Sequence, residues 1–198
     1  EDNIELMERY EDNYFDLAIV DPPYGIDVNV NMGRRKGDKK SDYHKFAGQD
    51  KSIPSESYFK ELFRVSKNQI IWGGNYFDLP PTRTIICWDK VVMIPTMSQI
   101  EIAWTSFDSP ARLVKINNTD KNRFHPTQKP IKLYKWLLSN YAKQGDKILD
   151  THLGSGSSRI AAYDMGFDFT GFELDPDYFE QGNKRFEQFK SQLKLFKN

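Results

Sequence analysis

Short apolar segments alternate with helical patterns along most of the chain. Six segments are rich in β-branched and aromatic residues, which predicts strands at 15–20, 68–73, 84–88, 101–107, 146–153 and 168–174. Four segments carry a helical pattern, which predicts helices at 55–67, 129–143, 157–166 and from 176 onward. Continuous apolar strands separated by helices are typical of a mostly parallel sheet covered on both faces. The sequence therefore predicts an α/β fold.

Three residues mark the expected helix ends. Ser55 and Asp175 are suitable N-caps, because their side-chain oxygens can accept hydrogen bonds from the first helical turn. Gly166 can adopt the left-handed backbone that ends many helices. No low-complexity linker divides the segments, so we expect one domain over residues 1–198.

The composition excludes several classes of protein. Cys87 is the sole cysteine, so an internal disulfide cannot form, and the three histidines, His44, His125 and His152, lack metal-ligand spacing. No apolar run approaches the roughly 20 residues that a membrane helix needs. We therefore expect no metal, no membrane contact and a reducing, cytoplasmic location.

Charge is unevenly distributed, although the formal net charge is zero. Residues 1–16 carry seven acids and one arginine, whereas residues 111–135 carry seven Lys or Arg and one Asp. A second basic run, 33–45, lies within a segment from 25 to 54 whose glycines and polar residues predict a mobile loop. The loop is either a solvated surface or a contact for phosphates, and the sequence leaves both interpretations open.

One predicted strand leads into a glycine-rich turn and a helix. Asp150 ends the strand, and Gly154 and Gly156 allow a tight turn before the helix. The next strand ends at Glu173, roughly 20 residues beyond, where an acid can bind ribose hydroxyls. This order predicts a nucleoside-binding unit. The GK[ST] of a phosphate-binding loop is missing from it, which argues against a nucleoside triphosphatase.

The first predicted strand ends in Asp21, Pro22, Pro23 and Tyr24. The two prolines stiffen the backbone and remove two N–H donors, so their carbonyls stay free as acceptors. Asp21 adds a second acceptor and Tyr24 a flat ring, which together suit an exocyclic amine on a planar base. The alternative is a strand-ending turn in which Tyr24 is merely packed.

Three motifs resemble one enzyme family. "DPPY" at 21–24, "HPTQKP" at 125–130 and "LDTHLGSGS" at 149–157 resemble the signatures of S-adenosylmethionine-dependent DNA amino-methyltransferases. Their order, with the catalytic motif first, resembles the permuted β group of N6-adenine methyltransferases. The resemblance implies a Rossmann-like sheet of seven strands with one antiparallel strand. It also implies double-stranded DNA as substrate, a nucleoid-associated enzyme and a role of the restriction-modification type.

The resemblance assigns roles to individual residues. Asp21 and the Pro22 carbonyl would accept hydrogen bonds from the target amine, and Tyr24 would stack on a flipped base, with Pro23 completing the catalytic motif. Thr127 and Lys129 would bind the carboxylate of the cofactor. The full set of implied cofactor contacts is Asp2, Asp21, Thr127, Lys129, Asp150, Gly154, Gly156 and Glu173. His125 and His152 are expected to be structural, because neither has an evident proton to move.

The sequence departs from the family pattern in two places, which affects the expected DNA recognition and the expected edge of the sheet. Only residues 108–124 fill the place of a target-recognition domain, and this insert is too short to fold alone. Sequence recognition is therefore modest, or comes from the loop at 25–54, from a second protomer in a homodimer or from a partner subunit. The chain also begins inside a segment that normally follows a strand, so we expect a few missing upstream residues and a weakened sheet edge.

Basic residues could hold DNA without reading its sequence. The residues predicted to contact phosphates are Arg34, Arg35, Lys36, Arg112 and Arg123. An N4-cytosine or RNA amino-methyltransferase and a protein-amide methyltransferase remain alternatives. From a different class, a non-catalytic nucleic-acid-binding subunit is a further alternative.

Overall fold

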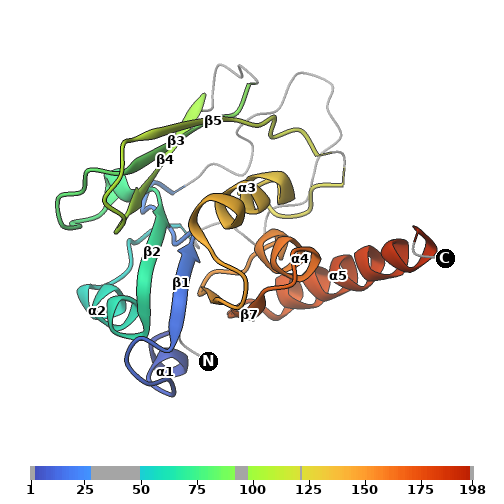
Figure 1. Cartoon of the computed structure of the whole chain (residues 1–198), viewed down its shortest axis with the longest axis horizontal. Helices are drawn as coiled ribbons and strands as arrows, with labels where there is room; N and C mark the ends of the chain where they lie inside the picture. Colours follow the sequence, from blue (N-terminus) through green and yellow to red (C-terminus); the bar gives the residue numbers. More distant parts are fainter. Residues whose placement is uncertain (1–2, 28–49, 92–97, 121, 197–198) are drawn as a thin grey trace.

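The computed structural model describes residues 3–27, 50–91, 98–120 and 122–196. Seven strands form one sheet in the order β5-β3-β4-β2-β1-β6-β7 (Figure 1). They are β1 (Phe15–Val20), β2 (Ser66–Trp72), β3 (Ile85–Asp89), β4 (Ile100–Thr105), β5 (Arg112–Lys115), β6 (Lys147–Asp150) and β7 (Asp168–Gly171). The helices are α1 (Asn3–Met7), α2 (Glu56–Val65), α3 (Ile131–Tyr141), α4 (Ser157–Asp164) and α5 (Pro176–Phe196), with a 3-10 turn η2 (Gly74–Tyr76).

The sheet is parallel apart from one strand. β1 pairs in parallel with β2 and β6, β6 with β7, and β3 with β5. β4 runs antiparallel to both β2 and β3. A seven-stranded sheet with one antiparallel strand is what the resemblance implied. The prediction of a Rossmann-like α/β fold is therefore confirmed.

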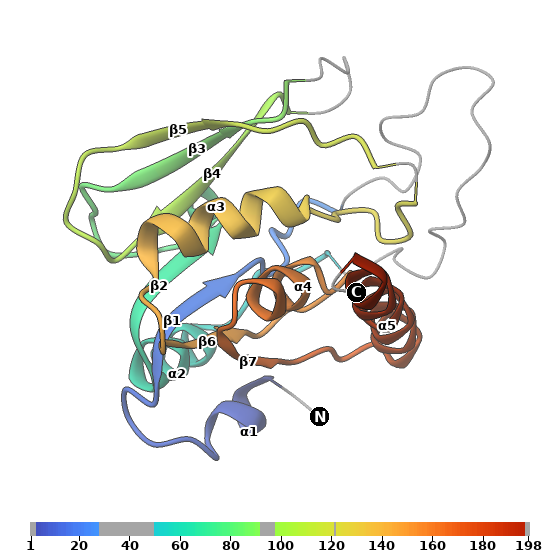
Figure 2. The same cartoon turned by 45° about the vertical axis from the view of Figure 1, so that its right-hand side comes forward.

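Helices cover both faces of the sheet (Figure 2). One hydrophobic cluster packs Leu133 and Leu137 of α3 and Ala161 of α4 against the sheet. The other cluster packs Met7 of α1 and Leu62 of α2 against the opposite face. Because apolar side chains are buried on both faces, the central strands do not alternate between apolar and polar residues.

The helix ends follow the predicted signals. Ser55 caps α2 by accepting a hydrogen bond from the Tyr58 N–H at 3.3 Å. Asp175 caps α5 by accepting from the Asp177 and Tyr178 N–H groups. Gly166 follows α4 with φ of 76°, the left-handed conformation expected there.

The sequence analysis missed β5. Leu113 is exposed and only Val114 of this edge strand is buried, so its residues lack the apolar run that marks the other strands. Segment 108–124, expected as a short insert, thus contributes a strand to the sheet. β5 pairs with β3, which leaves it at one edge.

Candidate functional site

The strand order reverses between β1 and β6. The chain leaves β1 through α2 towards β2 on one side, and it leaves β6 through α4 towards β7 on the other. Ala18 of β1 pairs with Leu149 of β6, so the two strands bring Asp21 and Asp150 to the same edge. Such a switch point is where open α/β sheets bind their ligands.

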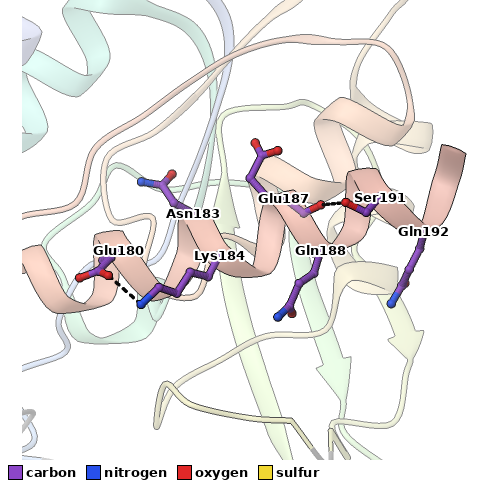
Figure 3. A pocket seen from close by; sticks show the side chains of 7 residues that line it. All are labelled: Glu180, Asn183, Lys184, Glu187, Gln188, Ser191 and Gln192. Carbon is purple, nitrogen blue, oxygen red and sulfur yellow. Dashed lines mark hydrogen bonds and ion pairs between the residues drawn. The ribbon is translucent and has the colours of Figure 1, made fainter.

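A cleft of about 760 Å³ lies at this edge of the sheet. Its walls include the DPPY segment, the turn around Gly154, Glu173 and residues 125–129. A second depression lies along α5 and is lined by side chains of that helix alone (Figure 3). Because one helix cannot surround a ligand, the cleft at the switch point is the candidate site.

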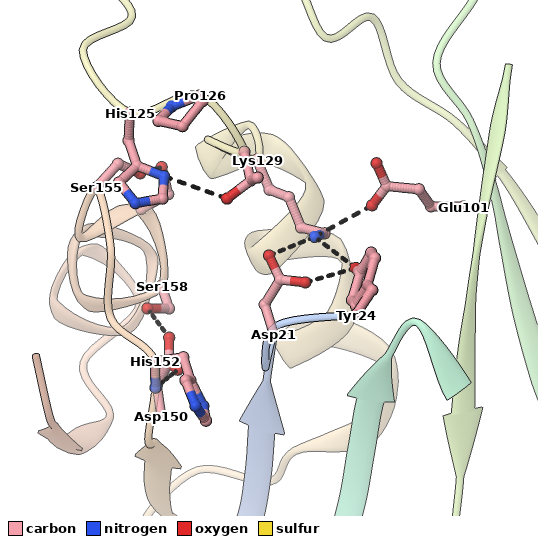
Figure 4. A network of polar contacts seen from close by, with 12 residues as sticks. Asp21, Tyr24, Glu101, His125, Pro126, Lys129, Asp150, His152, Ser155 and Ser158 are labelled. Atoms are coloured by element: carbon pink, nitrogen blue, oxygen red, sulfur yellow. Dashed lines mark hydrogen bonds and ion pairs between the residues drawn. The ribbon is translucent and has the colours of Figure 1, made fainter. Parts of the chain in front are cut away.

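Asp21 is held by two donors at the end of β1. The Tyr24 hydroxyl donates to its Oδ1 at 2.6 Å, and the Lys129 ammonium lies 2.5 Å from its Oδ2 (Figure 4). Lys129 comes from the residues just before α3, so α3 and β1 together orient the carboxylate. Each Asp21 oxygen still has lone-pair capacity for a further hydrogen bond.

Two charged residues that the sequence analysis missed complete this network. Glu101 at the start of β4 lies 3.1 Å from the Lys129 ammonium, and Lys90 lies 2.5 Å from the other oxygen of Glu101. Glu101, Lys90 and Lys129 are all largely buried, and all three line the cleft. The network thus contains two acids and two ammonium groups, and its formal charges cancel.

Burial and neighbouring charges shift the pKa values of the network. Burial alone would lower the pKa of Lys129, but the Asp21 and Glu101 carboxylates outweigh it, so the pKa is raised. Burial would also raise the pKa of Glu101, but the two lysines outweigh it and the pKa is lowered. Burial raises the pKa of Asp21, and Lys129 opposes that rise. Lys129 therefore opposes protonation of the buried Asp21 carboxylate.

Tyr24 is positioned by contacts distant in the sequence. Asp50 accepts hydrogen bonds from the backbone N–H groups of Tyr24 and Gly25, at 2.5 and 3.1 Å. Gly73, with φ of 70°, presses against the Tyr24 ring so closely that a Cβ there would lie 2.2 Å from it. Tyr76 stacks on the ring with centroids 5.0 Å apart and planes 13° apart. The sequence analysis identified none of these three supports.

The turn after β6 carries a different set of groups. The Gly154 N–H donates to Glu173 Oε2 at 2.6 Å, and the Asp175 N–H donates to Glu173 Oε1 at 2.9 Å. Gly154 and Gly156 have φ of 51° and 70°, in the left-handed region that favours glycine. The predicted glycine turn and the acid after β7 are therefore directly joined.

Asp150 lies buried beneath this turn. Its Oδ2 accepts from the Ser158 hydroxyl at 2.5 Å, and its Oδ1 accepts from the His152 N–H at 3.0 Å. Burial raises the pKa of Asp150 to about 7, although both hydrogen bonds oppose the rise. Neither Asp150 nor Glu173 forms an ion pair with a residue that the structure describes.

The two described histidines support the walls of the cleft. His125 packs against Tyr178 at 4.4 Å, and burial lowers its pKa to about 4, so it is neutral at physiological pH. His152 lies 3.1 Å from the Asn3 amide and 2.9 Å from the Thr151 hydroxyl. Both contacts agree with the expected structural role.

Some predicted contacts lie elsewhere or already have partners. Thr127 lines the cleft. The Lys129 ammonium already lies close to Asp21, Glu101 and the Tyr24 hydroxyl, so the predicted contact of Lys129 with a cofactor carboxylate requires it to leave one of them. Arg123 donates to the Pro126 and Asn118 carbonyls and so braces its own loop. Arg112 begins β5, and the cleft lining does not include it. Lying outside the described residues are Asp2, Arg34, Arg35 and Lys36.

Metal-binding clusters and membrane-spanning helices are both absent from the part of the chain that the structure describes. Among the described residues, no group of three or more His, Cys, Asp or Glu side chains is placed to hold a metal ion. Over the same residues, no helix combines the length and the apolar character needed to cross a membrane.

Comparison with protein families decides the assignment. A family model described as "DNA methylase" (N6_N4_Mtase) matches residues 71–184. This chain belongs to that DNA methylase family. The match includes HPTQKP, the glycine turn and Glu173, whereas DPPY lies before it.

Individual relatives and solved structures agree with this family. The type II methyltransferase M2.MboI of Moraxella bovis is 22% identical over 96% of this chain and 87% of its own length. The type II methyltransferase M.BglI of Bacillus subtilis is 33% identical over 43% of this chain and 24% of its own.

Two solved structures share the fold. The M1.HpyAVI–SAM complex has a TM-score of 0.61 and 19% identity, covering 93% of this chain and 96% of that one. The cytosine-N4-specific PvuII DNA methyltransferase has a TM-score of 0.64 and 14% identity, covering 96% and 88%.

Proposed function

We propose that this DNA methylase transfers the methyl group of S-adenosylmethionine to the N6 amine of a flipped adenine in double-stranded DNA. The observation that carries the proposal is the placement of Asp21. Its carboxylate is oriented by Tyr24 and Lys129 in the same cleft as Glu173 and the Gly154 turn. An acceptor for an amine and a nucleoside-binding turn thus share one cavity.

The turn after β6 fits S-adenosylmethionine. Glu173 accepts two backbone N–H bonds and keeps lone pairs for ribose hydroxyls. Asp150 and Glu173 give this side of the cleft an acidic character that suits a cationic sulfonium. The cleft volume of about 760 Å³ lies within the range for ligand pockets. We assign the amino-acid end of the cofactor to Asp150, Gly154, Gly156 and Thr127.

The chain's own residues then position the amine. Bound S-adenosylmethionine would supply an electrophilic methyl group on sulfur. Asp21 and the Pro22 carbonyl accept hydrogen bonds from the amine, which aims its lone pair at that methyl group. The Asp21 carboxylate would stabilise the positive charge that develops on nitrogen as the N–C bond forms and the methyl–sulfur bond breaks. The proton that the nitrogen then loses would pass to Asp21 and on to solvent. Tyr24 provides a stacking surface for the base.

Adenine is favoured over cytosine by the first residue of the motif. The resemblance links Asp at position 21 with N6-adenine enzymes, whereas N4-cytosine enzymes more often have Ser there. N4-cytosine remains the second candidate, because a cytosine-N4-specific methyltransferase has the same fold with a TM-score of 0.64. A cytoplasmic, nucleoid-associated enzyme would fit either substrate.

DNA binding is assigned partly to basic residues that the structure does not describe. Arg34, Arg35 and Lys36 belong to the segment between Asp27 and Asp50, whose ends are joined by a hydrogen bond of 2.8 Å. This bond holds the two ends of the segment together, and Asp50 also accepts from the Tyr24 N–H, so both ends lie beside DPPY, where phosphates of a bound duplex would pass. Pairing of two copies, or of this chain with a partner subunit, stays a prediction.

Methyl transfer to DNA tests the proposal. The protein is incubated with labelled S-adenosylmethionine and unmethylated genomic DNA. The DNA is then digested to nucleosides, which are separated and identified by mass spectrometry. We expect N6-methyladenine, and none with Asp21→Ala. N4-methylcytosine would replace the adenine assignment, and no methylated nucleoside despite binding of S-adenosylmethionine would overturn the DNA assignment.

A further inference from the structure

Tyr76 is an aromatic residue of the cleft to which the mechanism above gives no role. It ends η2, the turn that follows β2, and it lines the cleft beside Tyr24. Its side chain is 42% exposed, whereas the neighbouring Phe77 is buried. An exposed aromatic ring inside a ligand cleft suggests contact with a ligand rather than a part in the core.

The backbone that presents Tyr76 is tightly fixed. A Cβ on Gly73 would lie 2.2 Å from the Tyr24 ring, and a Cβ on Gly74 would lie 2.4 Å from Trp104 Cβ. On the other side, the Phe77 ring packs 5.3 Å from that of Phe59. The turn therefore cannot move far, whereas the exposed ring of Tyr76 can change rotamer rapidly.

The two tyrosine rings are in direct contact. Their centroids lie 5.0 Å apart with planes at 13°, an offset stack near the short end of the usual range of about 4.5–7 Å. No third ring fits between them at that distance. A base that stacks on this face of Tyr24 must therefore displace the Tyr76 ring.

We propose that Tyr76 is a second base-contacting residue, which moves off Tyr24 and stacks on the opposite face of the target base. The inference rests on the proposed function, since it names a further contact in the same site. With its backbone fixed, the displaced ring stays beside the cleft, so the base gains two aromatic faces. Stacking of this kind accepts any base, so Tyr76 contributes to holding the flipped base and not to reading it.

Base entry is measured with a fluorescent probe that needs no recognition sequence. The probe is a short duplex with one 2-aminopurine opposite an abasic site, because an unpaired base flips at low cost. Stacking quenches 2-aminopurine. We expect Tyr76→Ala to bind the probe roughly 10-fold more weakly, the loss of one base–aromatic stack, and with brighter emission per bound base. Tyr76→Phe keeps the ring and should match the wild type.

A matched control separates this effect from general loss of an aromatic side chain. Phe179 on α5 is 46% exposed and does not line the cleft, so Phe179→Ala should leave probe binding and emission unchanged. Binding of S-adenosylmethionine should be equal in all variants, which also shows that they fold.

The outcomes distinguish the inference from the proposed function. If wild-type protein methylates DNA and Tyr76→Ala binds the probe as well as the wild type, or more tightly, the inference is overturned and the proposed function stands. Tighter binding would mean that Tyr76 only competes with the base. Wild-type protein that neither methylates DNA nor binds the probe would overturn both.

Discussion

The two sides of the cleft handle negative charge in different ways. At the end of β1, Asp21 and Glu101 are neutralised by Lys129 and Lys90 within one buried network. After β6, Asp150 is held by a hydroxyl and a backbone N–H, and Glu173 by backbone N–H groups. We refer to these as the β1 side and the β6 side.

The difference follows the ligand that each side is proposed to bind. An adenine amine is neutral before transfer, so the β1 side needs an ionised acceptor without excess charge. A sulfonium is cationic, so uncompensated carboxylates on the β6 side favour it, and its approach would lower their raised pKa values. The cleft thus has one side whose charges are balanced and one side that is acidic.

The largest effect is expected from removing the shared cation. Lys129→Met leaves Asp21 and Glu101 buried without their common partner, which should lower the free energy of unfolding by about 3–5 kcal/mol. Urea unfolding measures the loss. Adding Glu101→Gln to Lys129→Met should recover part of it, and no recovery would show that the two acids do not share Lys129.

Asp21→Asn tests the acceptor itself. The substitution keeps the shape but removes the negative charge, which should slow methyl transfer roughly 100- to 1,000-fold, or about 3–4 kcal/mol. Single-turnover transfer is the measurement. Asp108→Asn, at an exposed position, is the control and should be neutral. A slowing of less than about tenfold would argue against charge stabilisation by Asp21.

Gly73→Ala tests the support of Tyr24. The new Cβ would overlap the Tyr24 ring, and Gly73 has φ of 70°, so we expect a loss of about 3 kcal/mol in stability together with slower transfer. Gly145→Ala is the matched control, since its φ is 93° but no atom lies within 4 Å of its Cβ. It should show the backbone cost alone, about 1 kcal/mol. Equal losses of stability in both variants would mean that the Tyr24 ring moves away from the new Cβ at little cost.

The smallest effect concerns Asp150 and pH. Burial raises its pKa to about 7 in the folded protein, above the ordinary 3.8, so the folded state holds a proton that the unfolded state releases. This stabilisation is complete below about pH 4 and is lost as the pH rises towards 7. Between about pH 5 and 6.5, wild-type stability should fall by about 2 kcal/mol relative to Asp150→Asn. Parallel pH profiles from urea unfolding would contradict a raised pKa.

Much of the fold could be predicted from the sequence, because the central strands are buried on both faces. FDLAIV coincides with β1, and the caps at Ser55 and Asp175 mark the starts of α2 and α5. β5 was missed because an edge strand with one buried residue has no apolar run. Local patterns therefore predict the elements that are buried and capped locally.

The candidate site was predicted in part. Asp21, Gly154 and Glu173 belong to motifs with their own local chemistry, and the structure brings all three to one cleft. Glu101 looks like an ordinary acid at the start of a strand, and only the antiparallel pairing of β4 with β2 brings it near Asp21. Tyr76 reaches Tyr24 because η2 follows β2, which pairs in parallel with β1. A charged residue at the start of a buried strand was the one signal for Glu101.

Binding of S-adenosylmethionine to two glutamine variants tests the division of the cleft most directly. Calorimetric titration compares Glu173→Gln, on the β6 side, with Glu101→Gln, on the β1 side. We predict at least about tenfold weaker binding for Glu173→Gln, the loss of a charged hydrogen-bond acceptor, and near-wild-type affinity for Glu101→Gln. Equal losses in both variants, or a loss confined to Glu101→Gln, would contradict the division.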